Sequence, residues 1–202
     1  MSIEVVPGTN AGFEVLVAPR RVPSRDGTAP GHGELVDILR AATAVPDHGH
    51  LRPWRFVVVS GSGRSSFSDA LVAGLREQDG GEVPASVSAK MAGKPDAAPM
   101  QVMVVASPVV ASNIPRWEQT VSASCAGYAI VLAATALGFG AAWKSARVLD
   151  TAPVRALFAA SPEEQLLGWI NLGTCEQGSI RRESDPLDLF DGRVTFVGPR
   201  PA

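Results

Sequence analysis

Two short segments of the sequence carry side chains that could bind a ligand. The first is Arg20-Arg21-Val22-Pro23-Ser24, in which two adjacent guanidinium groups stand close to a hydroxyl. A fixed pair of arginines with a nearby hydroxyl can hold a phosphate through charge-assisted hydrogen bonds. Adjacent arginines are also common as a solvated surface patch. The residues alone leave both interpretations open and favour the patch.

The second segment is a loop between two prolines, Pro46 to Pro53, which contains His48 and His50 and leads into the apolar run Phe56–Val59. Such a loop is poorly suited to fill a core, but it can present backbone groups and rings to a ligand. No carboxylate or cysteine cluster stands at a metal-ligand spacing from the histidines, so a metal site is not favoured. Taken alone, the histidines are ordinary loop residues.

No arrangement typical of catalysis by the protein's own acid, base or nucleophile stands out in the sequence. The turn Gly61-Ser62-Gly63 lacks the Lys-Ser/Thr ending of a P-loop and the third glycine of a dinucleotide fingerprint. Cys125 and Cys175 have neither metal nor redox-pair spacing, and the N-terminus has no signal-peptide pattern. We therefore expect reduced thiols and a cytoplasmic protein, in which a bound cofactor carries any difficult chemistry.

Composition sets the outer limits of the fold. The 202 residues suit one domain with a real core, and 46% hydrophobic with 19% charged residues indicate a globular chain. A net charge of -2 gives no argument for binding nucleic acid or an anionic membrane surface.

The longest element we expect is a helix from Glu118 to Phe139, because this stretch lacks proline and is dominated by helix formers. Its second half is apolar on every side, which is typical of a buried central helix or of a membrane span. Ala and Gly prevail and no charged flank follows the pattern of a span, so the buried helix is favoured. Small residues would allow close approach of a second backbone, as in a helix shared between subunits: Ala123, Ala126, Gly127, Ala129, Ala133 and Ala134.

Strands and helices alternate along the rest of the chain, which indicates an α/β or α+β domain. The patterns predict strands at Phe56–Val59, Met100–Ala106, Ala141–Ser145 and Gln165–Gly173, and helices at Glu34–Val45, Ser65–Gln78 and Val154–Ala160. Residues 1–18 are expected to form an edge strand or arm, and residues 79–99 a polar, mobile excursion with Lys90 and Lys94 in solvent. The apolar piece Arg193–Val197 would pair with a neighbouring subunit.

Four segments together match a family pattern: ILRAATAVPDHGHLRPWRFVVVSGSGR, IPRWEQTVSASCA, GFGAAWKSA and LLGWINLG. They resemble the nitroreductase family of FMN-dependent enzymes, and most of all its short bacterial branch. The similarity runs from about Arg20 to about Gly173. The proline loop and the Gly-Phe-Gly turn with its Trp-Lys-Ser ending are specific in combination.

The resemblance implies an α+β fold with a mixed central sheet flanked by helices, and a homodimer built around the long central helix. It implies FMN at the dimer interface, NAD(P)H as electron donor, and a ping-pong reduction of a nitroaromatic, quinone or similar acceptor. The core domain would span residues 34–178, after an N-terminal arm and loop of residues 1–33. The tail, residues 179–202, would pack on the partner subunit.

Carried over by position, the first group of FMN-binding residues lies in the arginine segment. Arg20 and Arg21 would bind FMN, with one guanidinium on the phosphate. Val22 stands where the family has a hydroxyl residue, so Ser24 would take that contact. Ala44 stands where this branch often has a basic residue.

The second group lies in the proline loop and after the long helix. His48 would reach the flavin of the other subunit, and Pro53 and Trp54 would shape the site from below. Three residues would line the isoalloxazine, with a backbone N–H near its N5 atom: Trp143, Lys144 and Ser145.

The same fold hosts other functions, so the sequence leaves alternatives. One is a flavin-dependent dehydrogenase, or a flavin-modifying enzyme, that acts on a specific metabolite. Another, from a different class, is a non-catalytic flavin-binding or degenerate dimer that stores or senses the cofactor.

Overall fold

The structure, a computed structural model, describes residues 11–17, 21–175, 195 and 197–198. Its α-helices are α1 (Ala11–Val17), α2 (His32–Arg40), α3 (Gly63–Asp79), α4 (Ala85–Ala92), α5 (Arg116–Ala136) and α6 (Ala152–Leu157). Short 3-10 helices are η1 (Ala41–Ala44), η2 (His48–His50) and η3 (Pro95–Ala97). The strands are β1 (Trp54–Ser60), β2 (Met100–Ala106), β3 (Gly140–Lys144) and β4 (Gln165–Gly173).

The four strands form one sheet in the order β1-β2-β4-β3. Every pair in it is antiparallel, whereas the resemblance implied a mixed sheet, so that part of the expectation is wrong for the described residues. The α+β class is confirmed. Strand β2 lies inside the sheet and all of its residues are buried, which explains why its sequence is apolar without alternation.

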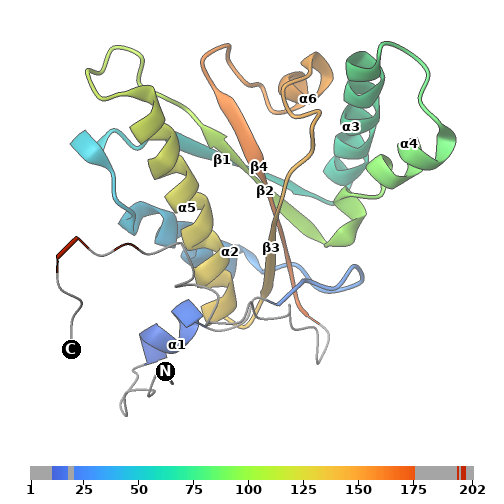
Figure 1. Cartoon of the computed structure of the whole chain (residues 1–202). Helices are drawn as coiled ribbons and strands as arrows, with labels where there is room; N and C mark the ends of the chain where they lie inside the picture. The colour runs from blue at the N-terminus through green and yellow to red at the C-terminus, as the bar shows by residue number, and fades with distance from the viewer. Residues whose placement is uncertain (1–10, 18–20, 176–194, 196, 199–202) are drawn as a thin grey trace.

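Two separate hydrophobic cores cover the two faces of the sheet (Figure 1). On one face, α2 and α5 pack through residues such as Ile38, Ala126 and Ile130. On the other, α3 and α6 pack around Trp169, where the Phe67 ring stands edge-on at 5.2 Å from the Trp169 ring centroid. Edge-to-face contacts of this kind add to the free energy gained by burying the rings.

Helix α5 lies along the sheet, as expected of a central helix, and four of its six named small residues face inward, whereas Ala129 lines an apolar hollow on its outer face. Ala123, Ala126, Gly127 and Ala134 are buried against the chain's own sheet and not on an outer surface. The outer face instead carries larger apolar side chains, among them Trp117 and Val121, which are 66% and 52% exposed. In the described part of the chain, α5 alone has the length and composition of a membrane span, a test that core helices also pass.

The structure differs from the sequence prediction at three other places. Residues 11–17 form helix α1, and not the edge strand that was one of the two alternatives for this segment. Residues 79–99 are no polar excursion, because they contain α4 and η3, and the Ser68 hydroxyl of α3 donates to the Ala92 carbonyl at 2.7 Å. Lys90 is exposed as predicted, but Lys94 is half-buried with its Nζ 5.9 Å from the Trp169 ring centroid. The expected pairing of residues 193–197 lies mostly outside the described residues.

Candidate functional site

Several of the predicted site residues gather at one end of the sheet. Trp54 opens β1 and pairs with Ala106, the last residue of β2, which in turn pairs with Gln165, the first residue of β4. Lys144, the last residue of β3, pairs with Trp169 of β4, which lies level with Val57 of β1 through Met103 of β2. Trp54 therefore lies at the end of the sheet, and Lys144 lies three residues further along it.

The proline loop reaches this end of the sheet through an unusual backbone. Gly49, His50 and Arg52 all have positive φ angles, of 73°, 54° and 49°. The Asp47 carboxylate holds the turn by accepting from the Arg52 N–H at 2.7 Å. Non-glycine residues with positive φ are uncommon, and such strain concentrates at ligand sites.

His48 is fixed to the long helix. Its exposed ring lies with Nδ1 2.9 Å from Oε2 of Glu118, in the first turn of α5. The loop backbone also lies close to Ile114, whose Cδ1 atom is 2.6 Å from the position of a Cβ at Gly49. The histidine is therefore held at the N-terminal end of α5 and not left free in solvent.

Pro53 and Trp54 lie where this loop leads into β1. Pro53 is buried, and its carbonyl accepts a hydrogen bond from the Ser107 N–H at 2.9 Å. The Trp54 side chain is half-buried and packs with the core cluster on the α5 face. Both residues therefore have positions set by the sheet.

The outer edge of β3 offers backbone donors. The Ala141 N–H points away from β4 and donates to the Arg21 carbonyl at 3.0 Å. Amide direction alternates along a strand, so the Trp143 N–H points to the same outer side, and Ser145 follows directly after the strand. Among the described residues the Trp143 N–H has no backbone partner there. From Ala141 to Ser145 this edge is about 13 Å long, taking ~3.3 Å per residue.

Trp143 contributes its backbone to that edge but turns its ring inward. The indole Nε1 donates to the Leu167 carbonyl at 3.4 Å, and the ring packs on Gly127 of α5. The side chains of Lys144 and Ser145 are exposed. Of the three residues predicted to line the isoalloxazine, two thus present side chains to solvent.

The arginine segment lies at the opposite end of β3. Arg21 and Val22 are exposed, and the Ser24 N–H donates to the Thr174 carbonyl at 2.8 Å. The segment passes so close to β3 that a Cβ at Gly140 would lie 2.6 Å from the Pro23 nitrogen. The structure therefore separates Arg21 from Lys144 by the length of β3, and Arg20 lies outside the described residues.

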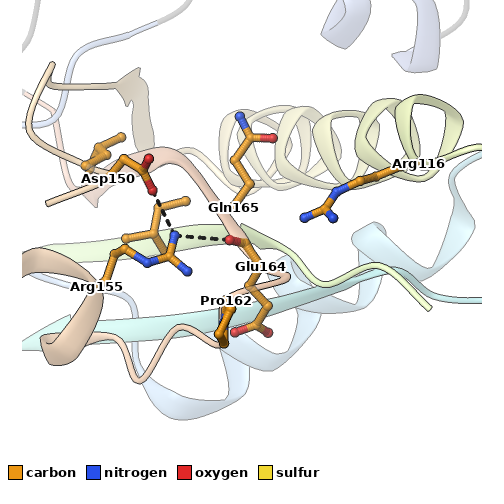
Figure 2. A pocket seen from close by; sticks show the side chains of 8 residues that line it. Arg116, Asp150, Arg155, Pro162, Glu164 and Gln165 are labelled. Atoms are coloured by element: carbon orange, nitrogen blue, oxygen red, sulfur yellow. Dashed lines mark hydrogen bonds and ion pairs between the residues drawn. The ribbon is translucent and has the colours of Figure 1, made fainter. Parts of the chain in front are cut away.

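The structure also shows a polar cavity of about 330 Å³ that the sequence did not indicate (Figure 2). Arg116 of α5 and Arg155 of α6 approach it from opposite sides, and Gln165 of β4 stands between them. The other lining residues are Leu149, Asp150, Pro162, Glu164 and Leu166. All of the lining residues except Arg116 lie between positions 149 and 166, so the cavity forms where this segment meets the start of α5.

A buried ion pair supports the wall of this cavity. Arg55 of β1 binds both carboxylate oxygens of Glu164, at 2.7 and 2.8 Å, and also donates to the Phe158 carbonyl at 2.9 Å. The hydrogen bonds from Arg55 lower the pKa of Glu164 to about 2, although burial by itself would raise it. The same bonds raise the pKa of Arg55. Glu164 is therefore ionised and neutralised by Arg55.

A second hollow, of about 440 Å³, is apolar and opens on the outer face of α5. Val121, Cys125, Tyr128 and Leu132 line it from the helix, and residues 44–46 close one side. Val121 and Tyr128 are about half exposed in the single chain. Within the described part of the chain, no group of three or more His, Cys, Asp or Glu side chains could hold a metal ion.

Comparison with known proteins gives three findings. The model of the Nitroreductase family matches residues 26–174. A protein of Escherichia coli (strain K12), named "Putative NAD(P)H nitroreductase YdjA", is 37% identical over 162 residues, which are 80% of this chain and 87% of the relative.

Solved structures agree on the fold. A nitroreductase-like family protein from Bacillus cereus superposes with a TM-score of 0.77 at 19% identity, over 96% of this chain and 100% of the other. A nitroreductase with bound FMN from Bacteroides fragilis gives a TM-score of 0.66 at 24% identity, over 94% and 100%.

Proposed function

The chain belongs to the nitroreductase family, a family of oxidoreductases, and from this premise we propose that it is an FMN-dependent enzyme that uses NAD(P)H. FMN, when bound, would supply the redox chemistry that couples hydride transfer from NAD(P)H to the reduction of a nitroaromatic, quinone or similar acceptor in a ping-pong sequence. No acid, base or nucleophile motif stands out in the sequence, which agrees with an enzyme whose cofactor carries the chemistry.

The observation that carries the proposal is the outer edge of β3. It presents the outward N–H group of Trp143 beside the exposed Lys144 and Ser145, and it has the exposed Arg21 at its far end. An edge of about 13 Å with an amide donor at one end and a guanidinium at the other suits an elongated ligand with a polar ring and a phosphate. FMN has this chemistry, and the residues present fit it.

The chain's own residues would hold and orient the cofactor. Arg21 would bind the phosphate, and the amide of Trp143 would donate to the ring. Lys144 would stabilise negative charge on the ring, because a cation favours charge developing next to it. Trp143 would act through its backbone, since its indole ring is packed on Gly127.

We propose a homodimer whose interface includes the outer face of α5. The apolar hollow around Val121 and Tyr128 is open in the single chain, and exposed apolar surface of this kind marks association sites. His48, fixed at the N-terminal end of α5 by Glu118, would then reach across to the flavin of the partner subunit. The site would thus need both subunits.

The family match over residues 26–174 supports a core domain of residues 34–178, between an arm of residues 1–33 and a tail of residues 179–202. Both cysteines are free thiols, which supports a cytoplasmic location.

The first test is an absorbance spectrum of the purified protein, before and after incubation with FMN and desalting. Retained flavin bands that bleach on addition of NADH or NADPH, and recover with a nitroaromatic or a quinone, are the expected result. A protein that stays colourless at saturating FMN contradicts the proposal and leaves a degenerate dimer. Bound flavin that NAD(P)H does not reduce points to storage or sensing, and reduction without transfer to these acceptors points to a specific metabolite.

A further inference from the structure

The polar cavity between α5 and α6 has a charge arrangement that its neighbours do not fully satisfy. Of its ionisable lining residues, Arg116 and Arg155 are cationic, and Asp150 and Glu164 are anionic. The Glu164 carboxylate is already bound at both oxygens by Arg55, so it is neutralised within the wall. The two cavity arginines, Arg116 and Arg155, are each paired with one exposed carboxylate, Glu163 and Asp150.

The remaining carboxylate partners are weak. Asp150 lies 2.9 Å from Arg155 Nη1, but its side chain is 93% exposed. Arg116 pairs with Glu163 at 2.9 Å, where both side chains are more than half exposed. Ion pairs in solvent contribute about 0–1 kcal/mol, so an incoming anion can displace these carboxylates at little cost.

Arg155 is held in place independently of Asp150. Its guanidinium donates to the Glu164 carbonyl at 3.2 Å and to the Ser161 carbonyl. The side chain is only 20% exposed, so its position does not depend on a surface partner. Gln165 adds an exposed amide between the two arginines, and within the described residues this amide makes no hydrogen bond (Figure 2).

We propose that Arg116, Arg155 and Gln165 form a binding site for the oxyanion of a small molecule, a carboxylate or a phosphate. Guanidinium groups bind planar and tetrahedral oxyanions through paired hydrogen bonds, and an amide N–H adds a neutral donor. A cavity of about 330 Å³ accepts a group of this size together with part of the molecule that carries it.

The site is close enough to the redox site to act on its substrates. Gln165 lies across two strand spacings from Trp54, because both pair with Ala106, and this corresponds to about 10 Å. Arg116 lies two residues before Glu118, the partner of His48. In the context of the proposed function, on which this step rests, the site holds the anionic end of an electron acceptor or the phosphate of the nicotinamide donor.

Calorimetric titration of the full-length, FMN-saturated protein tests the site directly, with benzoate and inorganic phosphate as probes. Arg116→Gln should weaken binding about tenfold, since a hydrogen bond to a charged group is lost. Glu163→Gln should tighten it about threefold, because a competing exposed carboxylate is removed. Arg40→Gln is the matched control, as Arg40 of α2 also forms an exposed ion pair, with Asp37, but does not line the cavity.

Weaker probe binding in Arg116→Gln and tighter binding in Glu163→Gln, with the affinity of Arg40→Gln unchanged, support the proposal. If the residues were purely structural, the two substitutions would not change the affinity in opposite directions. Equal affinities in all four proteins, or no binding of either probe, overturn it. Preference for benzoate assigns the site to an acidic acceptor, and preference for phosphate assigns it to the donor.

Turnover separates this proposal from the general function. In Arg116→Gln the KM for 4-nitrobenzoate should rise about tenfold if the acceptor uses the site, with the KM for neutral 4-nitrobenzamide unchanged. A rise in the KM for NADPH but not for NADH would show that the donor phosphate uses it instead. If no nitro compound is reduced but the affinities for the probes still change in the variants, the anion site is supported and the nitroreductase activity is not. If turnover is normal but the affinities do not change, the nitroreductase activity is supported and the anion site is not.

Discussion

The indole ring of Trp143 packs directly on the backbone of Gly127, so that the ring lies between strand β3 and helix α5. A Cβ at Gly127 would lie 2.6 Å from the Cζ3 atom of the indole, which is closer than carbon atoms normally approach. Glycine at this position therefore lets Trp143 turn its ring inward while its backbone stays on the outer edge of the sheet.

Gly127→Ala should consequently destabilise the protein by about 1–3 kcal/mol, because an added methyl group in a tightly packed core forces neighbours to shift. The free energy of unfolding in urea, at fixed protein concentration, measures the change.

Gly33→Ala is the control for this substitution, because Gly33 also lies in a helix but has no atom within 4 Å of an added Cβ. There the change should be neutral or stabilising by up to about 1 kcal/mol, since alanine favours helix. Equal effects at the two positions would contradict the packing argument.

Glu164 should make the protein sensitive to acid. Its pKa is about 2 in the folded protein, below the ordinary value of 4.5, so the Arg55–Glu164 pair stabilises the fold fully above pH 4.5. This stabilisation is lost as the pH falls from 4.5 toward 2. Glu164→Gln should destabilise by about 2 kcal/mol at pH 7 and reduce the loss of stability in that interval.

The neighbouring Glu163→Gln provides the comparison, because Glu163 forms an exposed pair with Arg116. Its effect on the unfolding free energy should stay below about 0.5 kcal/mol at any pH. Unfolding curves between pH 2.5 and 7 test this prediction. If the unfolding free energies of both variants depend on pH in the same way, the Arg55–Glu164 pair is not the source of the acid sensitivity.

Much of the fold follows from local patterns. The limits of β2 and β4 agree with the sequence prediction, because both strands are runs of mostly apolar residues. The long helix was also located, since nothing within it competes with helix formation. Helix α1 was not predicted, because seven residues, 11–17, are too few to distinguish the periodicity of a helix from that of a short strand.

From the sequence, residues of the candidate site could be proposed only where they lie together in one segment. The proline loop and the Trp-Lys-Ser segment were found from their own residues and their resemblance to a family. The inward turn of the Trp143 ring depends on Gly127, sixteen positions earlier in another element. The arginine pair of the polar cavity joins α5 to α6, and the pairing of Arg55 with Glu164 joins β1 to β4. Contacts between distant segments leave no periodic signal.

His48 should contribute to flavin binding through its fixed position. His48→Ala should raise the dissociation constant for FMN several-fold, as one hydrogen bond contributes about 0.5–1.5 kcal/mol. Glu118→Ala should have a smaller effect in the same direction, because it releases the ring without removing it. Fluorescence titration with FMN measures both constants. His32→Ala, an exposed histidine at the start of α2, should leave the constant unchanged. An unchanged constant in His48→Ala would remove His48 from the proposed site.

The outer face of α5 should hold the two subunits together. Val121→Glu places a carboxylate in the apolar hollow, where an unpaired charge would have to lose its water on association, so the dimer should dissociate at micromolar concentration. Sedimentation velocity should then show a species of half the mass, with FMN lost because the site requires both subunits. Val87→Glu changes a valine of similar exposure on α4, which packs with α3 on the opposite face of the sheet, and should leave the mass unchanged. A Val121→Glu protein that remains dimeric with FMN bound would place the subunit interface elsewhere.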